Sequence, residues 1–149
     1  MKRIFVDTGA WYALVDKKDP DHVKAKESYN SNTTPFITTN FIFDEIITLL
    51  MSRLGWDVSS KFGDGLKKSS LASVIAVTDV DEDKAWELFL KYEDAGFSYT
   101  DCTSFAVMER LRIDTAFTFD VHFKTMKFTA VPELQEGISI SSSMIKSAT

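Results

Sequence analysis

The chain has few of the residues that mark several common classes of protein. Its 149 residues include one cysteine, Cys102, which excludes an internal disulfide and a cysteine-based zinc site. No apolar run approaches the roughly 20 residues that cross a bilayer, and the first residues lack a signal-peptide cleavage pattern. We therefore expect a soluble, cytoplasmic protein with no membrane association.

Basic residues are in the minority as well. Seventeen Lys and Arg side chains face 22 Asp and Glu, for a net charge of -5. That balance argues against broad adhesion to nucleic acid, which normally requires a basic surface. The net charge can mislead, however, because a metal site concentrates acidic residues whose charge a bound cation then neutralises. Basic residues do group locally, but such groups are more often solvated helix ends than binding patches.

The composition and the order of patterns indicate one α/β domain. Apolar residues make up 44% of the chain and aromatic residues 13%, enough for a substantial core. Short β-rich runs alternate with helical patterns, and this alternation predicts a three-layer α/β/α sandwich with a central, mostly parallel sheet. The expected strands are 2–6, 35–38, 72–77, 115–119 and 128–131.

Helices are expected between these strands, at 10–15, 20–30, 40–54, 79–95 and 101–111. Asp19 is the predicted N-cap of the second helix, with Pro20 at its first position, and Thr100 is the predicted cap of the last. Residues 56–70 are ambiguous because two glycines interrupt a weak helical pattern. We assign residues 1–136 to the domain and 137–149 to a Ser-rich C-terminal tail.

Two aspartates follow strand-like runs directly. Asp7 ends IFVD, and Asp120 ends TAFTFD. In a parallel sheet both residues reach the edge formed by the carboxyl ends of the strands, where α/β proteins bind ligands. Taken singly, each is more simply an ordinary turn aspartate after a strand.

Glu45 belongs to the helix predicted at 40–54, which is apolar nearly all round and is therefore expected to be buried. At 100° per residue, Glu45 lies on an apolar stripe, whereas Asp44 lies on a polar one. Asp44 can then remain solvated, while Glu45 needs a partner. A buried ion pair with Arg53 or Arg110 would also satisfy it.

Asp101 stands in the first turn of its predicted helix, where the helix dipole favours an acid in any protein. However, four acids placed at element ends or on an apolar stripe seldom arise from four unrelated causes. Carboxylates suit Mg²⁺ or Mn²⁺, and an acid-only site can activate water for phosphodiester hydrolysis. His122 follows Asp120 by two positions and could approach this site, although an isolated histidine is usually a surface or packing residue.

Four segments resemble the PIN domain, and most closely its small toxin nucleases of the VapC type. They are FVDTGAWYAL (5–14), TTNFIFDEIITLL (38–50), SYTDCTSFAVM (98–108) and TAFTFDVHF (115–123). The resemblance covers residues 1 to about 132. It implies a parallel sheet between helices, with Asp7, Glu45, Asp101 and Asp120 holding Mg²⁺ or Mn²⁺ as the catalytic cluster.

The same resemblance assigns supporting hydroxyls to Thr8 and Thr118, which otherwise read as turn and strand threonines. Gly9 stands where the family usually has Ser or Thr, so one secondary polar contact is in doubt. The implied activity is endoribonucleolytic, with a protein antitoxin and a homodimer as the expected partners. Candidate contacts to RNA phosphates are the basic residues Lys67, Lys68, Arg110, Arg112 and Lys124.

Two other functions remain possible from the residues. One is a catalytically inactive PIN-like module that binds RNA or supports assembly, although such a module has little reason to keep four unfavourable charges. The other is phosphoryl transfer with Asp7 as nucleophile. VDTGA lacks the second aspartate, two residues on, that such phosphatases typically show.

Overall fold

A computed structural model describes residues 2–70 and 72–133. Its centre is a five-stranded sheet in the order β3-β2-β1-β4-β5, in which every pairing is parallel. The strands are β1 (Ile4–Val6), β2 (Phe36–Thr39), β3 (Ala72–Ile75), β4 (Thr115–Phe117) and β5 (Thr129–Val131). The predicted parallel sheet is confirmed. The expected end of the domain at 136 and the Ser-rich tail lie outside the described residues.

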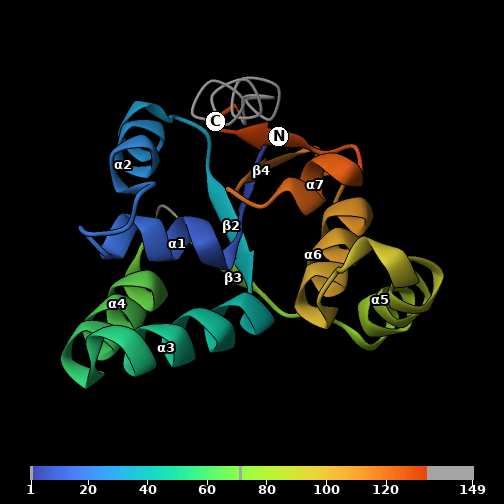
Figure 1. The fold of residues 1–149 in the computed structure, drawn as a ribbon, viewed down its shortest axis with the longest axis horizontal. Helices are drawn as coiled ribbons and strands as arrows, with labels where there is room; N and C mark the ends of the chain where they lie inside the picture. Colours follow the sequence, from blue (N-terminus) through green and yellow to red (C-terminus); the bar gives the residue numbers. More distant parts are fainter. Residues whose placement is uncertain (1, 71, 134–149) are drawn as a thin grey trace, which may run out of the picture.

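The helices form one layer on each face of this sheet (Figure 1). The first layer contains α1 (Thr8–Val15), α2 (His22–Ser31), α3 (Asn40–Leu54) and α4 (Trp56–Lys68). The second contains α5 (Asp79–Lys91), a short 3₁₀ turn (Glu93–Ala95), α6 (Tyr99–Arg110) and α7 (Val121–Thr125). The expected three-layer sandwich is therefore confirmed. None of the helices in the described part of the chain combines the length and apolar character needed to span a bilayer.

The strand order creates a switch point between β1 and β4. From β1 the chain moves outward to β2 and β3 through the first helix layer, then returns across the sheet to β4 through the second. The chain therefore leaves β1 and β4 toward opposite faces, which opens a crevice beyond their carboxyl ends. Asp7 and Asp120 both follow strands at this crevice.

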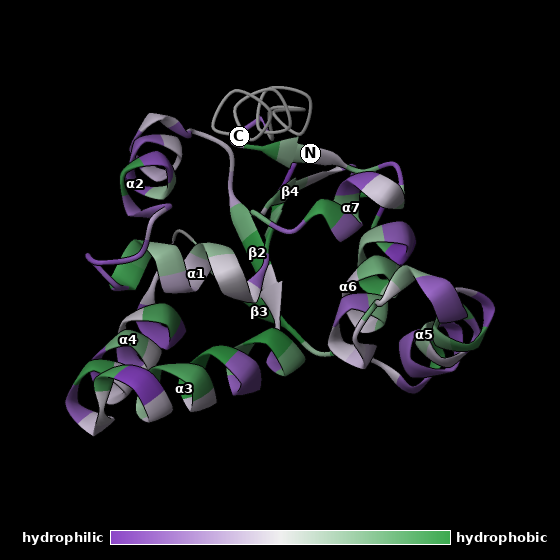
Figure 2. Ribbon diagram, in the orientation of Figure 1, coloured by the Kyte–Doolittle hydropathy of each residue, from purple (hydrophilic) through white to green (hydrophobic). Residues whose placement is uncertain are grey.

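The core is built from the strands and the sheet-facing sides of the helices. Phe5, Ile37 and Phe117 are fully or almost fully buried, and Phe105 and Phe123 pack edge to face at 5.0 Å between α6 and α7. Figure 2 shows hydrophobic residues along the strands, with hydrophilic residues interspersed along the outer helices. Burial of apolar area is the largest favourable contribution to folding.

The burial expected for α3 is wrong. Its bounds agree with the prediction, and Gly55 ends it at φ 92°, in the region that favours glycine. Only the stripe of Ile42, Ile46 and Leu50 is buried, whereas Glu45 is exposed. One side of α3 packs on its neighbours and the other borders an open cleft, so an apolar sequence does not imply burial all round.

Helix starts also differ from the predictions. The second helix begins at His22 rather than Pro20, because Asp19 accepts a hydrogen bond from the Asp21 backbone N (2.8 Å) in a turn. The last long helix begins at Tyr99, with Ser98 rather than Thr100 as its cap. The ambiguous stretch at 56–70 contains α4, and α7 was not predicted at all.

Candidate active site

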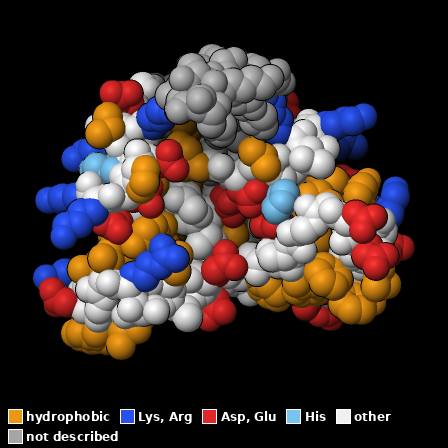
Figure 3. All heavy atoms as spheres, viewed as in Figure 1, with side chains coloured by type: hydrophobic (Ala, Val, Ile, Leu, Met, Phe, Trp, Pro, Cys, Tyr) orange, Lys and Arg blue, Asp and Glu red, His pale blue; other side chains and the backbone are white. Residues whose placement is uncertain are grey.

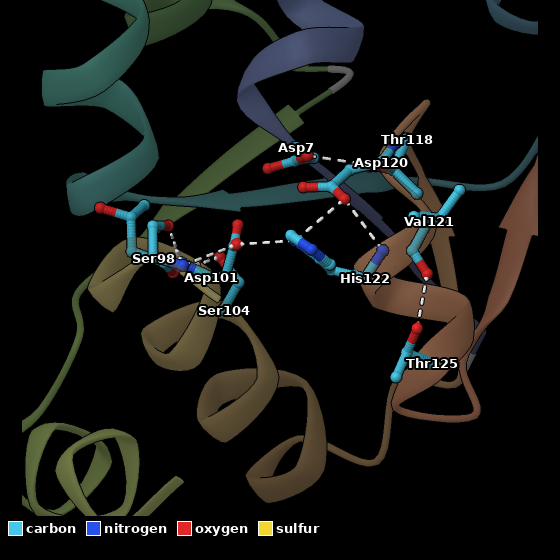
Figure 4. Close-up of polar contacts among 10 residues, drawn as sticks. Asp7, Ser98, Asp101, Ser104, Thr118, Asp120, Val121, His122 and Thr125 are labelled. Atoms are coloured by element: carbon cyan, nitrogen blue, oxygen red, sulfur yellow. Dashed lines mark hydrogen bonds and ion pairs between the residues drawn. The ribbon is translucent and has the colours of Figure 1, made fainter. Parts of the chain in front are cut away.

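Three aspartates from distant parts of the chain meet at the crevice. Asp7 follows β1, Asp101 lies in the first turn of α6, and Asp120 precedes α7 (Figure 4). Asp7 is only 7% exposed, and its Oδ2 accepts a hydrogen bond of 3.1 Å from Thr118 Oγ1. The sheet edge thus brings together the two strand-end acids, as the parallel arrangement predicted.

Asp7 occupies an unfavourable position for a charge. Burial raises its pKa to about 7, and the negative charges of Asp101 and Asp120 add to this rise. The Thr118 hydroxyl and the Thr8 backbone N–H work in the opposite direction but do not cancel it. A cation between the three carboxylates would remove this electrostatic cost.

Asp101 is held by a capping box at the start of α6. Its Oδ2 accepts from the Ser98 backbone N at 3.0 Å, and its own N donates to Ser98 Oγ at 3.0 Å. Burial raises the pKa of Asp101, and the charge of Asp120 raises it further. The Asp101 carboxylate therefore caps the N-terminus of α6 and is also a member of the acidic cluster.

His122 joins this cluster, although an isolated histidine in a sequence is usually a surface or packing residue. Its Nδ1 lies 3.3 Å from Asp101 Oδ2 and 3.1 Å from Asp120 Oδ1. The backbone N of His122 also donates to Asp120 Oδ1 at 2.9 Å, because Asp120 is the N-cap of α7. An Asp followed two residues later by His, read as the start of a short helix, would have indicated this contact.

Glu45 lies on the wall of the adjoining cleft. This cleft has a volume of about 840 Å³, and its lining includes Thr8 and Thr100, the sequence neighbours of Asp7 and Asp101. Figure 3 shows acidic side chains around a hollow in the middle of this face, with a histidine beside them. Asp44 lines the same cleft, so the two neighbouring acids of α3 are both available to it.

The alternative of a buried ion pair for Glu45 is not found among the described residues. The Arg53 guanidinium lies over the Tyr12 ring, 5.1 Å from its centroid. Arg110 bonds Asp81 through two hydrogen bonds of 2.7 and 2.9 Å. Both arginines therefore have other neighbours, and Glu45 remains exposed toward the cleft.

The two threonines assigned by resemblance have different environments. Thr118 is fully buried and bonds both Asp7 and the backbone N of Asp120. Thr8 Oγ1 is buried without any hydrogen-bond partner, and within residues 2–70 and 72–133 it is the one buried side-chain polar atom in that condition. A buried hydroxyl without a partner normally has an unseen one, such as an ordered water or an ion. Its place on the cleft wall is consistent with ligands at the acids.

The five candidate RNA contacts are dispersed. Lys67 lies over the Phe43 ring, 5.1 Å from its centroid, and Lys68 pairs with Asp64 at 3.7 Å on exposed α4. Arg110 is engaged by Asp81, and Arg112 is exposed just after α6. Lys124 belongs to α7, the helix that begins at Asp120.

The residues present fit a divalent cation. Ligand atoms of Asp101, Asp120 and His122 all lie within 4.8 Å of one another. Asp7 adds a carboxylate whose pKa is raised by burial and by the charges of Asp101 and Asp120. Carboxylate oxygens suit hard divalent ions such as Mg²⁺ and Mn²⁺. The orphaned hydroxyl of Thr8 gives a further polar atom beside the acids.

Fold and site together define a parallel α/β protein that gathers acids at the switch point of its sheet. The PIN domain family model matches residues 4–129. The chain belongs to the PIN domain family.

Relatives with assigned activities extend this result. The chain is 34% identical over 128 residues to the 23S rRNA-specific endonuclease VapC20 of Mycobacterium tuberculosis, covering 86% of this chain and 97% of that protein. It is 32% identical over 114 residues to a VapC ribonuclease of Archaeoglobus fulgidus, covering 72% and 71%. The closeness of these matches shows kinship with VapC ribonucleases.

Solved structures give the same picture. The crystal structure of M. tuberculosis VapC20, described as a Sarcin-Ricin loop cleaving toxin, matches with a TM-score of 0.80 at 34% identity, over 84% of this chain and 95% of that one. A toxin–antitoxin complex from Klebsiella pneumoniae matches with a TM-score of 0.66 at 13% identity, over 88% and 99%. The second likeness supports the fold alone.

Proposed function

We propose that this protein is a Mg²⁺- or Mn²⁺-dependent endoribonuclease, and that it acts in the cytoplasm as the toxin of a toxin–antitoxin pair. The observation that carries the proposal is the meeting of Asp7, Asp101 and Asp120 at the switch point, where burial and mutual repulsion raise the pKa of Asp7 to about 7. Placing buried carboxylates this close together is electrostatically unfavourable, and such an arrangement is expected where a cation binds between them.

Asp7, Asp101, Asp120 and Glu45 are the proposed ligands and catalytic residues. A divalent ion held there would lower the pKa of a water and stabilise charge on the phosphodiester. The fold positions the carboxylates for this role. Strands β1 and β4 position Asp7 and Asp120, and the capping box of α6 positions Asp101. Thr118 orients Asp7, and Glu45 faces the cleft through which RNA would approach.

The names of the relatives support RNA as the proposed substrate class. VapC20 is named for cleavage of 23S rRNA, so an RNA hairpin taken from that molecule is the first substrate to test. A protein antitoxin and a homodimer are proposed partners. Of the five basic residues predicted from the sequence as phosphate contacts, Lys124 is the first choice, because it belongs to the helix that begins at Asp120. Arg110 is the last choice, because its guanidinium bonds Asp81.

The test is cleavage of such a hairpin by the purified protein with Mg²⁺ or Mn²⁺. Asp7→Asn and Asp101→Asn are expected to abolish cleavage, as is excess chelator. Asp57→Asn is the matched control, since Asp57 forms an exposed surface pair with Lys61 and its loss is expected to leave the rate unchanged. Cleavage at the wild-type rate in Asp7→Asn or in chelator would refute the proposal. Binding of the hairpin without cleavage would favour the inactive RNA-binding module instead.

A further inference from the structure

His122 stands between two of the proposed metal ligands. Its Nδ1 is 3.1 Å from Asp120 Oδ1 and 3.3 Å from Asp101 Oδ2, and Figure 4 shows the ring pointing between the two carboxylates. The three side chains come from the start of α6, the end of the β4 segment and the first turn of α7. The imidazole therefore faces the same point as the acids.

Two contacts hold the ring in this orientation. Phe97 packs edge-on against it, with ring centroids 5.1 Å apart at 79°. The hydrogen bond of 2.9 Å from the His122 backbone N to Asp120 Oδ1 fixes the two residues relative to each other. The Nδ1 position is thus set by the fold.

The spacing matches that of ligands on one ion. Mg²⁺-sized octahedral sites have bonds of about 2.1 Å, so adjacent ligand atoms lie about 3 Å apart. The two Nδ1–oxygen separations, 3.1 and 3.3 Å, are close to this value. They also suit a hydrogen bond, whose proton a bound cation would replace. All three ligand atoms also lie within 4.8 Å of one another, as ligands around a single ion must.

We propose that His122 supplies an imidazole nitrogen to the divalent cation bound by Asp101 and Asp120, and that this nitrogen makes the site prefer Mn²⁺ to Mg²⁺. The inference rests on the proposed metal-dependent function. Mg²⁺ takes oxygen ligands almost alone, whereas transition-metal ions accept imidazole readily and bind mixed sites more tightly. A site of carboxylates with one histidine therefore discriminates between two ions that an all-acid site would treat more alike.

The composition of the chain makes a direct test possible. His22 is the other of its two histidines, and its Nδ1 lies 2.7 Å from the Ala13 carbonyl oxygen, between α1 and α2. Pulsed electron paramagnetic resonance of Mn²⁺ bound to the full chain at pH 8 reports any ¹⁴N nucleus directly attached to the ion. The measurement is made on the wild type, on His22→Gln as the matched control, and on His122→Asn.

The expected result is a ¹⁴N coupling in the wild type and in His22→Gln that is lost in His122→Asn. Titration should show a Mn²⁺ affinity about 10–100-fold weaker in His122→Asn, with a much smaller change for Mg²⁺. Folding of the variant is checked by its circular dichroism, but the wild-type and His22→Gln spectra decide the question without it.

The outcomes separate the two proposals. Carboxylate-dependent Mn²⁺ binding without any ¹⁴N coupling in the wild type would overturn the role of His122 and leave the metal-dependent nuclease standing. A coupling that disappears in His22→Gln would overturn it too. Failure of the wild type to bind Mn²⁺ at all would remove the metal site itself, and with it both proposals.

Discussion

Thr118 Oγ1 donates a hydrogen bond of 3.1 Å to Asp7 Oδ2, joining two residues 111 positions apart in the chain. The same hydroxyl accepts a bond of 3.0 Å from the backbone N of Asp120. Because Thr118 is fully buried between β4 and α7, one side chain fixes how the two strand-end acids lie relative to each other. The separation of the acids therefore depends on a residue that need not touch a ligand.

Replacing this hydroxyl by a methyl group tests that dependence. Thr118→Val keeps the shape of the side chain but leaves Asp7 without its donor, so we expect RNA cleavage to fall by about 10-fold or more. The free energy of unfolding should fall by about 1–2 kcal/mol. Cleavage rates and urea denaturation of the two proteins measure the two effects.

Thr38→Val is the matched control for this prediction. Thr38 is equally buried, and its hydroxyl donates to the Val6 carbonyl oxygen at 2.9 Å rather than to an acid. A similar loss of stability is expected, with cleavage retained. If both variants lose activity in proportion to stability, the Thr118–Asp7 bond has no special role in the site.

The raised pKa of Asp7 predicts an unusual pH dependence of stability. Since the pKa is about 7 in the folded protein against an ordinary 3.8, the folded state binds more protons than the unfolded state between about pH 4 and pH 7. The free energy of unfolding of the metal-free protein should therefore fall as pH rises through this window, by at most about 4 kcal/mol. The raised pKa of Asp101 acts in the same direction.

Asp7→Asn isolates this contribution. In chelator at pH 8 the variant should be more stable than the wild type by about 2–4 kcal/mol, while near pH 4 the two should be similar. Denaturation at several pH values measures the difference, and Asp57→Asn should follow the wild type throughout. Equal free energies of unfolding for wild type and Asp7→Asn at pH 8 would mean that the ionised Asp7 carboxylate does not destabilise the folded state.

The sheet and its edge could be predicted because the strands are short apolar runs that alternate with helical patterns. Asp7 and Asp120 each end an apolar run, and a parallel sheet places such ends together. His122 could not be placed the same way, because its contact depends on α7, a helix of five residues with too little periodicity to predict. The exposure of Glu45 could not be predicted either, because the apolar sequence of α3 does not indicate that one side of the helix borders a cleft.

Glu45 and Asp44 provide a test of how α3 faces the site. Both line the cleft, but at 100° per residue Arg53, which contacts Tyr12 of α1, is about 80° from Glu45 around α3 and about 180° from Asp44. The side of α3 that carries Glu45 is therefore nearer than that of Asp44 to α1, which begins at Thr8 beside Asp7. We expect Glu45→Gln to reduce cleavage by about 10-fold or more and to weaken Mn²⁺ binding, whereas Asp44→Asn should change both little. The reverse ranking would mean that the other stripe faces the metal site.

Arg110 was proposed from sequence as a phosphate contact, and its surroundings give a different expectation. Its guanidinium makes two bonds to Asp81, whose side chain is 2% exposed and also caps α5 through Thr78. Loss of the arginine leaves a buried carboxylate without its cation, which costs about 2–4 kcal/mol here because Arg110 itself is 37% exposed. Arg110→Met should therefore lower stability by that amount and leave RNA affinity unchanged.

Arg112→Met is the matched control, since Arg112 is exposed and follows the same helix by two residues. It should leave the free energy of unfolding nearly unchanged, and any phosphate contact by Arg112 should appear as weaker RNA binding with a shallower dependence on salt. Urea denaturation and RNA titrations at several salt concentrations measure both variants. A loss of RNA affinity in Arg110→Met at unchanged stability would show that the arginine leaves Asp81 to bind phosphate. The observed bidentate geometry, which fully occupies one edge of the guanidinium, predicts the opposite.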